Sequence, residues 1–453
     1  MKDLMQLAWR GLKQKRKLTL LMVLNLAIGI TLLLTMGTIV TRSGHSPIDQ
    51  RADRVYHVSL NFMDPEFDRR SEFRSPPLTF RDAGALAEAF SANDTTRISF
   101  NYTTSFVLDL PDKSVRPVTA EASAADPQYF DLLQVPFIYG APWREDMQDA
   151  AVIVLDKKAN DLLFGGANSI GKQVVINNHQ LEVVGVMDMS AYLRRFQNMR
   201  FQARANDMAV VPLGYAHANN LPRTGYMPCR TKEEAARTRY RREDVQGLKS
   251  AECGYLHAWA VLDPMQHDNS LAELTLWMRN YTQQQASQGR FGHSEPYYLT
   301  QLASLNDRMS DNLYWEQIYL KFAYLLFAIC LINTIGILLA KNQSRAKLVS
   351  LYRALGANKL YILKVQLLEL SMLSSAAIAL GLLLAQFGLV AMFHLALYQA
   401  DYLADAEQVR RMYSMDTLFA LQAAVGIFVA IFAAGLYPII KASHTAPAAQ
   451  LRG

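Results

Sequence analysis

Four long apolar segments constrain this chain more than any other feature of its sequence. The segment 18–40 has no charged residue, and three further segments with at most one charge lie at 317–340, 367–397 and 417–440. A helix rises 1.5 Å per residue, so each segment can cross the roughly 30 Å hydrocarbon core of a bilayer. Buried helices of soluble proteins rarely stay uncharged over such lengths. The pattern therefore predicts four transmembrane helices.

The first apolar segment is predicted to be a retained helix rather than a cleaved signal peptide. Its apolar stretch is too long for a signal peptide, and no small-x-small cleavage site follows Val40. Residues 1–17 before it predict a cytoplasmic amphipathic helix, with Trp9 at the level of the lipid headgroups.

Charge predicts the orientation of the spans. The segments 1–17, 341–366 and 441–453 together hold 14 Lys or Arg residues and one acid, Asp3. The segment 41–316 instead holds more acidic than basic residues. Because basic loops stay on the cytoplasmic side, both termini and the loop 341–366 are expected in the cytoplasm. The loop 398–416 is then a short periplasmic connection.

The segment 41–316 is expected to form one large extracytoplasmic domain of mixed strands and helices. Thr79 followed by Asp82 predicts a helix start, and Gly165 follows the last residue of another helix. The expected strands are 55–60, 105–110, 115–121, 151–155, 173–176, 181–186, 208–211 and 257–262, and the expected helices are 77–90, 126–133, 157–164 and 270–285. The fold class is therefore an α-helical membrane protein with a large α+β domain inserted between helices 1 and 2.

No motif in the sequence indicates an enzyme. The segment Gly166–Gln173 resembles a phosphate-binding loop, but Gln173 stands where such a loop needs Ser or Thr, and a strand is expected to follow. The nine His residues show no metal-ligand spacing, and no Gly-x-Ser-x-Gly elbow occurs. We expect no catalytic residue, no metal and no cofactor on this chain.

Polar side chains are few inside the predicted spans. They could line a substrate or proton path, or they could hydrogen-bond between helices. The second interpretation is favoured because no carboxylate lies near the middle of a span, which also indicates that energy for transport comes from elsewhere. These residues are Asn25, Asn333, Glu369, Gln386 and Gln422.

Small residues recur every fourth position in the last two spans. This spacing lets helix backbones approach closely and predicts helix–helix contacts, although it also arises by chance in alanine-rich helices. The residues are Ala377, Gly381 and Ala385 in the third span and Gly426, Ala430 and Ala434 in the fourth.

Two of the three cysteines, Cys229 and Cys253, fall in the extracytoplasmic segment, whereas Cys330 lies inside the second span. A pair in an oxidising compartment could form a disulfide, but the spacing alone does not decide whether these two meet.

The basic loop 341–366 predicts a helix that ends at Gly356, followed by a new helix that enters the membrane. A partner protein could push on such a helix and move both adjoining spans as rigid bodies. The alternative is a plain loop that only fixes topology.

Several motifs, in this order, resemble those of the FtsX/MacB-type permeases of ABC transporters, the mechanotransmission class. The resemblance covers nearly the whole chain. The motifs are the basic segment 8–15 leading to Ile28-Gly29-Ile30, the stretches 151–155, 163–165, 170–172 and 183–186, the segment 345–357 with Gln366 and Glu369, and the ending 437–443 and 447–452.

This resemblance implies a permease that transmits ATPase motion to a periplasmic MacB-like domain in the bacterial inner membrane. It implies a cytoplasmic ABC ATPase subunit, binding ATP and Mg²⁺, and a second permease copy or a sister permease. It further implies efflux of antibiotics, peptides or other amphiphiles with a periplasmic adaptor and an outer-membrane channel. Lipoprotein-releasing and FtsX-like relatives use the same lever on a periplasmic partner. The residues expected to contact the ATPase are Arg345, Lys347, Leu351, Arg353, Leu355 and Gly356.

Two departures from the family matter. The chain has no nucleotide-binding domain, so the ATPase is expected to be a separate subunit. Lys347 stands where many relatives carry an acid, so the contact chemistry with the ATPase is expected to differ.

Overall fold

The computed structural model contains two compact units. The membrane unit comprises residues 1–44, 312–401 and 409–453, and the inserted domain comprises residues 45–311 and 402–408. The structure describes residues 2–44, 47–65, 75–191, 196, 207–225, 227–239, 245–293, 296–304, 311–345, 351, 356–399 and 406–443.

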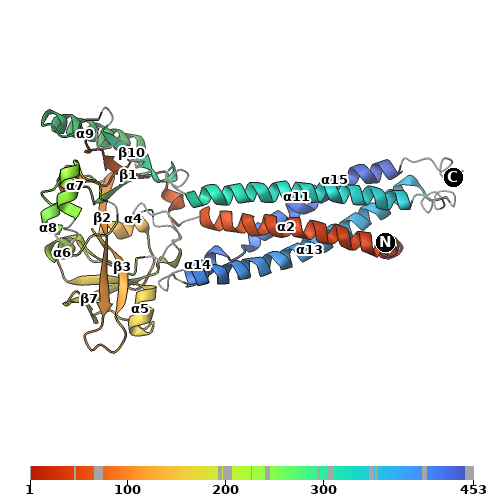
Figure 1. Cartoon of the computed structure of the whole chain (residues 1–453), viewed down its shortest axis with the longest axis horizontal. Coiled ribbons are helices and arrows are strands. Elements are labelled where there is room, and N and C mark those ends of the chain that lie inside the picture. Colours follow the sequence, from red (N-terminus) through yellow and green to blue (C-terminus); the bar gives the residue numbers. More distant parts are fainter. Residues whose placement is uncertain are drawn as a thin grey trace. The chain divides into compact units, whose positions relative to one another are not determined.

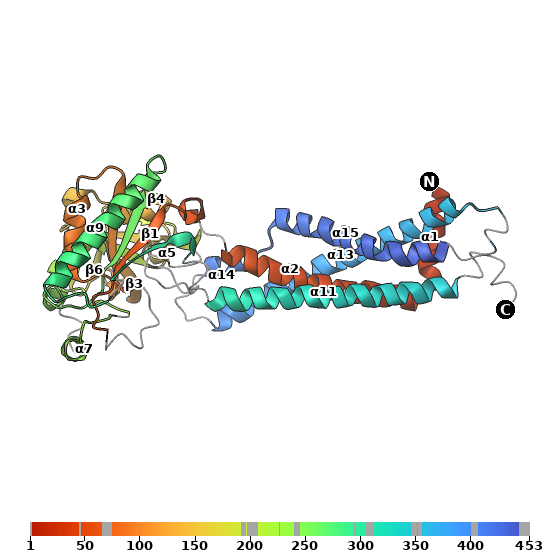
Figure 2. The ribbon, with the colours of Figure 1, turned by 90° about the horizontal axis from the view of Figure 1, so that it is seen from above.

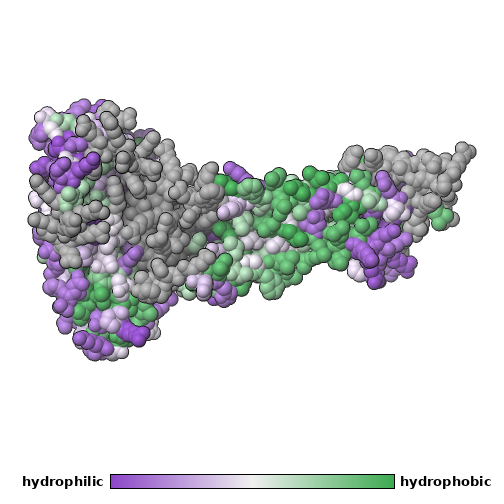
Figure 3. Space-filling view, in the orientation of Figure 1, coloured by the Kyte–Doolittle hydropathy of each residue, from purple (hydrophilic) through white to green (hydrophobic). Residues whose placement is uncertain are grey.

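The described residues of the membrane unit form helices and short connections between them (Figure 1). Four of them are long and apolar enough to cross a bilayer, as the sequence predicts: Arg16–Arg42, Gln317–Ser344, Lys359–Tyr398 and Val409–Ile440. Hydrophobic side chains cover much of their outer surface, which is where lipid tails would lie (Figure 3). The helices of this unit are α1 (Lys2–Gln14), α2 (Arg16–Gly44), α11 (Asp311–Ser344), α13 (Lys359–Gln399) and α15 (Thr417–Ser443), and α14 (Ala406–Met412) is divided between the two units.

Helix α2 packs against both α13 and α15. It buries a stripe of four side chains spaced by four residues, Met22, Leu26, Ile30 and Leu34, each at most 1% exposed. Residues at this spacing share one helix face, so the stripe forms a ridge that fits between neighbouring helices. A break at Lys15 separates α1 from α2, and α1 lies across the end of the long helices (Figure 2).

The inserted domain is built on one mixed sheet. Among the described residues, ten strands pair in the order β10-β1-β9-β2-β3-β8-β5-β7-β4, with β6 pairing β2 and β7. Only the β3–β8 and β5–β7 pairs are parallel. The strands are β1 (Val55–Leu60), β2 (Thr96–Asp109), β3 (Val118–Ala125), β4 (Phe137–Gly140), β5 (Val152–Asp156), β6 (Gln173–Ile176), β7 (His179–Met187), β8 (Ala209–Pro212), β9 (His257–Leu262) and β10 (Tyr297–Gln301).

Both faces of this sheet are covered. Along β9, Ala258 and Ala260 join one apolar core, whereas Trp259 and Val261 join a second. Successive residues of a strand point to opposite faces, so a strand buried on both sides shows no polar alternation. The helices of the domain are α3 (Phe80–Phe90), α4 (Gln128–Leu133), α5 (Lys157–Phe164), α6 (Leu213–Ala218), α7 (Lys232–Arg239), α8 (Val245–Leu248) and α9 (His267–Ser287), with 3₁₀ turns at Pro47–Arg51, Glu145–Met147 and Met189–Ala191.

Local signals in the sequence mark several of these elements correctly. Thr79 accepts a hydrogen bond from the Asp82 backbone N–H at the start of α3, and Gly165 ends α5 with a φ of 63°. The β6–β7 hairpin turns through Asn177 and Asn178, both with positive φ. Gln173 begins strand β6, which confirms the expected strand at a position where a phosphate-binding loop would be followed by a helix.

Other expectations were incomplete. Strand β2 begins at Thr96 rather than at 105, because its buried central residues hide the alternation that marks a strand. Helix α4 begins at Gln128. Asp126 accepts hydrogen bonds from the backbone N–H groups of both Tyr129 and Phe100, so it also ties α4 to β2. The sequence did not predict strands β4 and β10 or helices α6 and α8, and α14 lies in the segment 398–416, which was expected to be a loop.

Candidate functional site

A buried ion-pair cluster joins three helices at the end of the membrane unit that carries the basic residues. Arg345, just after α11, donates from Nη1 to both carboxylate oxygens of Glu369 on α13, each at 3.0 Å. Its Nη2 donates to the carbonyl oxygen of Gly11 on α1. One guanidinium group therefore contacts α1 and α13 while fixed to the end of α11.

Lys341 completes this cluster from inside α11. Its side chain is 1% exposed, and its Nζ pairs with Glu369 and lies 3.4 Å from Oγ1 of Thr19 on α2. A charge at this depth is costly unless it is paired, which explains the arrangement of two cations around one carboxylate. We call Lys341, Arg345, Glu369 and Gly11 the helix junction.

Further from the junction, the helices approach closely at small residues. A Cβ added at Gly381 of α13 would lie 2.6 Å from Cγ2 of Ile30 on α2, and one at Gly37 would lie 2.7 Å from the Phe419 ring. Asn25 donates to the Cys330 carbonyl at 2.8 Å, so this polar side chain bridges α2 and α11. Of the polar residues predicted to link helices, Asn25 and Glu369 do so, whereas Asn333, Gln386 and Gln422 are exposed on the surface of the membrane unit.

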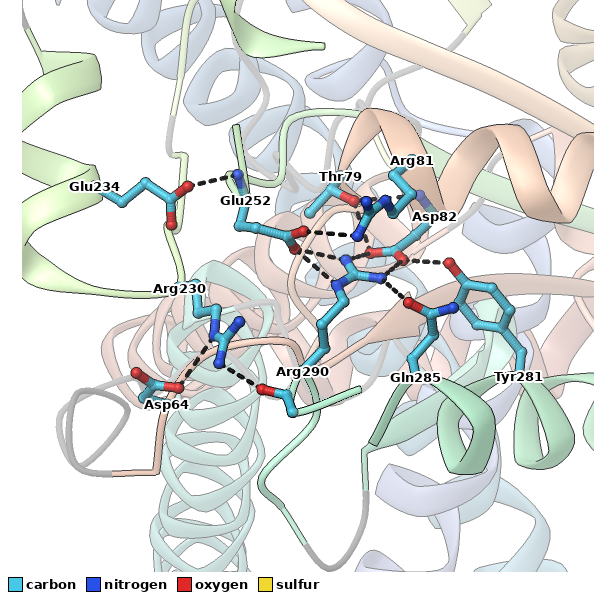
Figure 4. Close-up of polar contacts among 11 residues, drawn as sticks. Asp64, Thr79, Arg81, Asp82, Arg230, Glu234, Glu252, Tyr281, Gln285 and Arg290 are labelled. Atoms are coloured by element: carbon cyan, nitrogen blue, oxygen red, sulfur yellow. Dashed lines mark hydrogen bonds and ion pairs between the residues drawn. The ribbon is translucent and has the colours of Figure 1, made fainter. Parts of the chain in front are cut away.

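The inserted domain has its own buried charge network, drawn in Figure 4. Arg290, after α9, donates to both oxygens of Asp82 in the first turn of α3 and to Glu252, at 2.6 to 3.1 Å. Glu252 is next to Cys253, which forms a disulfide with Cys229. Arg290 thus links α3, the segment after α9 and the disulfide-bonded segment.

The domain also contains a groove of about 580 Å³ beside α3 and β2. Phe80, Phe90 and Phe100 contribute apolar surface to it. Burial raises the pKa of Asp126 in this groove to about 7. Burial, and then the charge of Lys249, lower the pKa of His217 to about 4, so the histidine is neutral at pH 7. Besides its apolar walls, the groove is lined by two exposed side chains of opposite charge, Arg97 and Glu145.

No cluster of His, Cys, Asp or Glu within the described part of the chain could hold a metal ion.

Two family models match the sequence. The model of the MacB-like periplasmic core domain matches residues 19–243, and that of the FtsX-like permease C-terminal matches residues 320–447.

The chain belongs to the FtsX/MacB-type ABC permeases. It is a multi-pass membrane protein whose family members work with an ATPase partner. No curated protein sequence matches the permease.

Two similar solved structures come from bacteria. The periplasmic region of MacB from Actinobacillus actinomycetemcomitans has a TM-score of 0.34 and 15% identity, covering 58% of the permease and 96% of that chain. The extracellular domain of the noncanonic ABC-type transporter YknZ from Gram-positive bacteria has a TM-score of 0.33 and 11% identity, covering 54% of the permease and 99% of that chain.

The residues expected to contact the ATPase fall partly within the described structure. Arg345 lies at the helix junction, Leu351 is exposed, and Gly356 has a φ of 98°, which suits a chain reversal before α13. Lys347, Arg353 and Leu355 lie outside the described residues.

The two predicted small-residue motifs differ in the permease. Ala377 and Ala385 are fully buried, and Gly381 faces α2. In α15, Gly426 instead faces open space, and Ala430 and Ala434 are half-buried. Helix α15 approaches α13 closely at Gly435, where an added Cβ would meet Leu370. A helix contact at Gly426 stays a prediction.

Sequence reasoning missed the roles of Lys341 and of Arg290. For Lys341, the signal was a Lys at the edge of one span and a Glu at the edge of the next, both of which need a partner in an apolar setting. Arg290 had no comparable signal, because its partners lie 208 and 38 residues away in the sequence.

Proposed function

We propose that the permease is the membrane subunit of an ATP-driven ABC export system and transmits motion of a separate ATPase to the inserted domain. The observation that carries this proposal is the helix junction, where Arg345 links α1, α11 and α13. A force applied to the segment between α11 and α13 would move these three helices together, because their ends share charge-assisted hydrogen bonds.

Energy for this motion is proposed to come from ATP and Mg²⁺ bound by the partner ATPase. A proton-driven transporter needs ionisable groups along its spans. Glu369 is already paired with Lys341 and Arg345 at one end of the bundle, so it is poorly placed to carry protons across.

The charge distribution supports an orientation in the bacterial inner membrane with both termini in the cytoplasm and the inserted domain in the periplasm. Single cysteines in exposed loops test this orientation, in a background in which Cys330 is replaced by Ser. A membrane-impermeant thiol reagent should label Lys113→Cys and not Lys15→Cys in intact spheroplasts. Labelling of Lys15→Cys but not of Lys113→Cys would show the opposite orientation and contradict the proposal.

The proposed cargo is an antibiotic, a peptide or another amphiphile, passed on with a periplasmic adaptor and an outer-membrane channel. The groove beside α3 supports an amphiphilic cargo, because apolar walls next to polar and charged side chains suit a molecule of mixed polarity. Two copies of the permease, or the permease and a sister chain, are proposed to form the membrane core.

The lever is tested by replacing Arg353 and Gly356 together with Glu. The double variant should still insert into the membrane, yet ATP hydrolysis should no longer change distances between spin labels in the inserted domain. Lys113→Glu, a charge reversal in an exposed turn, is the control. Unchanged coupling in the double variant would refute the lever.

The alternative is an FtsX-like or lipoprotein-releasing mechanotransmitter that acts on a periplasmic partner. Gly84→Leu separates the two, because a Cβ at Gly84 meets nothing within 4 Å and the larger side chain would occupy the groove. An exporter of amphiphiles should lose transport while keeping its fold, whereas a mechanotransmitter should be unaffected. Copurification of an adaptor supports export, and copurification of a cell-wall hydrolase supports the alternative.

A further inference from the structure

A cavity of about 360 Å³ lies beside the helix junction, between α1, the end of α11 and the start of α13. Ile362 and Val365 of α13 form part of an apolar wall, and Arg10, Asn342 and Gln366 contribute polar side chains. Arg345 and Glu369 of the junction also line it. All of these elements belong to the membrane unit.

Three polar atoms of the residues lining this cavity are buried and have no hydrogen-bond partner within the described chain. They are Nδ2 of Asn342, Nε of Arg345 and Oε1 of Gln366. A buried donor or acceptor without a partner costs about 1–3 kcal/mol, and more when the group is charged. Three of them around one cavity indicate that a ligand supplies their partners.

The charges around the cavity favour an anion. Arg10, Lys341 and Arg345 lie at or beside it, and Glu369 is the carboxylate among its lining residues. The Glu369 carboxylate already accepts from both Lys341 and Arg345, so positive charge remains in excess. Two of the three unpartnered atoms are N–H donors, which an anionic oxygen satisfies.

The position of the cavity favours a lipid. Helix α1 is amphipathic and exposes Met5 and Trp9, as does a helix that lies at the membrane interface. The cavity therefore lies where headgroups meet acyl chains, and basic pockets between helices at that level bind anionic headgroups. A soluble anion would gain nothing from the apolar wall of Ile362 and Val365.

We propose that this cavity binds one anionic glycerophospholipid with a hydroxyl-bearing headgroup, of the phosphatidylglycerol class. Its phosphate accepts from Asn342 and Arg345, and a headgroup hydroxyl donates to Gln366. Its acyl chains lie against the α13 wall. The bound lipid braces α1 against α11 and α13 and so becomes part of the helix junction.

The test uses the full chain purified in a neutral detergent. Native mass spectrometry and thermal unfolding are followed with palmitoyl-oleoyl phosphatidylglycerol, with the matching phosphatidylcholine and with inorganic phosphate. We expect one tightly bound phosphatidylglycerol per chain, at least about tenfold tighter than phosphatidylcholine, which corresponds to about 1.4 kcal/mol. Equal affinity for the two lipids would overturn the proposal, and so would equal stabilisation by inorganic phosphate.

The variants Asn342→Leu and Gln366→Leu separate a ligand site from a merely structural one. Each removes an unpartnered buried atom, so the lipid-free melting temperature should stay the same or rise. Affinity for phosphatidylglycerol should nevertheless fall about tenfold. Lys15→Gln is the control for general attraction to anionic lipid, because Lys15 lies at the same end of the membrane unit but does not line the cavity. This variant should bind phosphatidylglycerol as tightly as the parent does. A lower lipid-free melting temperature with unchanged affinity would refute the site.

Discussion

Arg290 and Asp82 form a two-pronged ion pair inside the inserted domain, with Nη1–Oδ1 at 2.8 Å and Nη2–Oδ2 at 3.1 Å. Their side chains are 4% and 0% exposed. Tyr281 also donates to Asp82, at 2.7 Å, and burial followed by the charge of Asp82 raises the pKa of this tyrosine far above its usual range. The hydroxyl therefore keeps its proton and remains a donor to the pair.

Truncating Arg290 should destabilise the inserted domain severely. Arg290→Met leaves Asp82 buried without its cation, and breaking one partner of a buried pair costs about 3–5 kcal/mol. Arg81→Met is the matched control, because Arg81 also pairs with Glu252, at 3.3 Å, but its side chain is 61% exposed. The free energy of unfolding of the control should fall by at most about 1 kcal/mol. Chemical denaturation of both variants measures the difference, and equal losses would contradict a special role for the buried pair.

The disulfide between Cys229 and Cys253 should stabilise the same part of the domain. It closes a loop with a sequence separation of 24 residues, for which loop-closure entropy predicts about 3.5 kcal/mol. The double variant Cys229→Ser/Cys253→Ser should unfold at correspondingly lower denaturant. Dithiothreitol should lower the free energy of unfolding of the parent by a similar amount and leave that of the double variant unchanged. A parent insensitive to reduction would show that the bond contributes little.

The sequence predicts the four spans well because their apolar composition is dictated by the lipid itself. It also locates α5 and the β6–β7 hairpin, where Gly165 and the Asn177-Asn178 pair mark local turns. It does not reveal the Arg290 network or the helix junction, since these depend on which distant segments pack together. Edge strand β10 was missed because its five residues are all half-buried and show no alternation.

Gly381 and Gly426 should respond differently to substitution by Ala. An added Cβ at Gly381 would lie 2.6 Å from Ile30, so α13 and α2 must move apart, at a cost of about 1–3 kcal/mol. Gly336→Ala on α11 is the control, because a Cβ there meets nothing within 4 Å. Thermal unfolding in detergent compares the three variants.

Gly426→Ala should behave like the control within a single chain, since its added Cβ also meets nothing within 4 Å. Ala favours a helix interior by roughly 0.5–1 kcal/mol over Gly, so the monomer should become slightly more stable. A loss of dimer at the same time, measured by size-exclusion chromatography with light scattering, would place a second chain at this face. Loss of monomer stability would contradict the packing described for α15.

His57 should make the inserted domain sensitive to acid. Its ring is fully buried, and neither ring nitrogen has a hydrogen-bond partner among the described residues. Burial, and then the charge of His257, hold the pKa of His57 well below its usual 6.5. The unfolded chain therefore binds an extra proton below pH 6.5, so the free energy of unfolding falls as the pH falls, by up to about 1.4 kcal/mol per pH unit from this group.

His57→Phe should remove this contribution. In urea unfolding, the free energy of unfolding of the variant should rise relative to that of the parent as the pH is lowered from 6.5 to 5. The exposed His179→Gln is the control and should follow the parent. Parallel pH profiles for His57→Phe and the parent would show that this buried imidazole does not control the acid response.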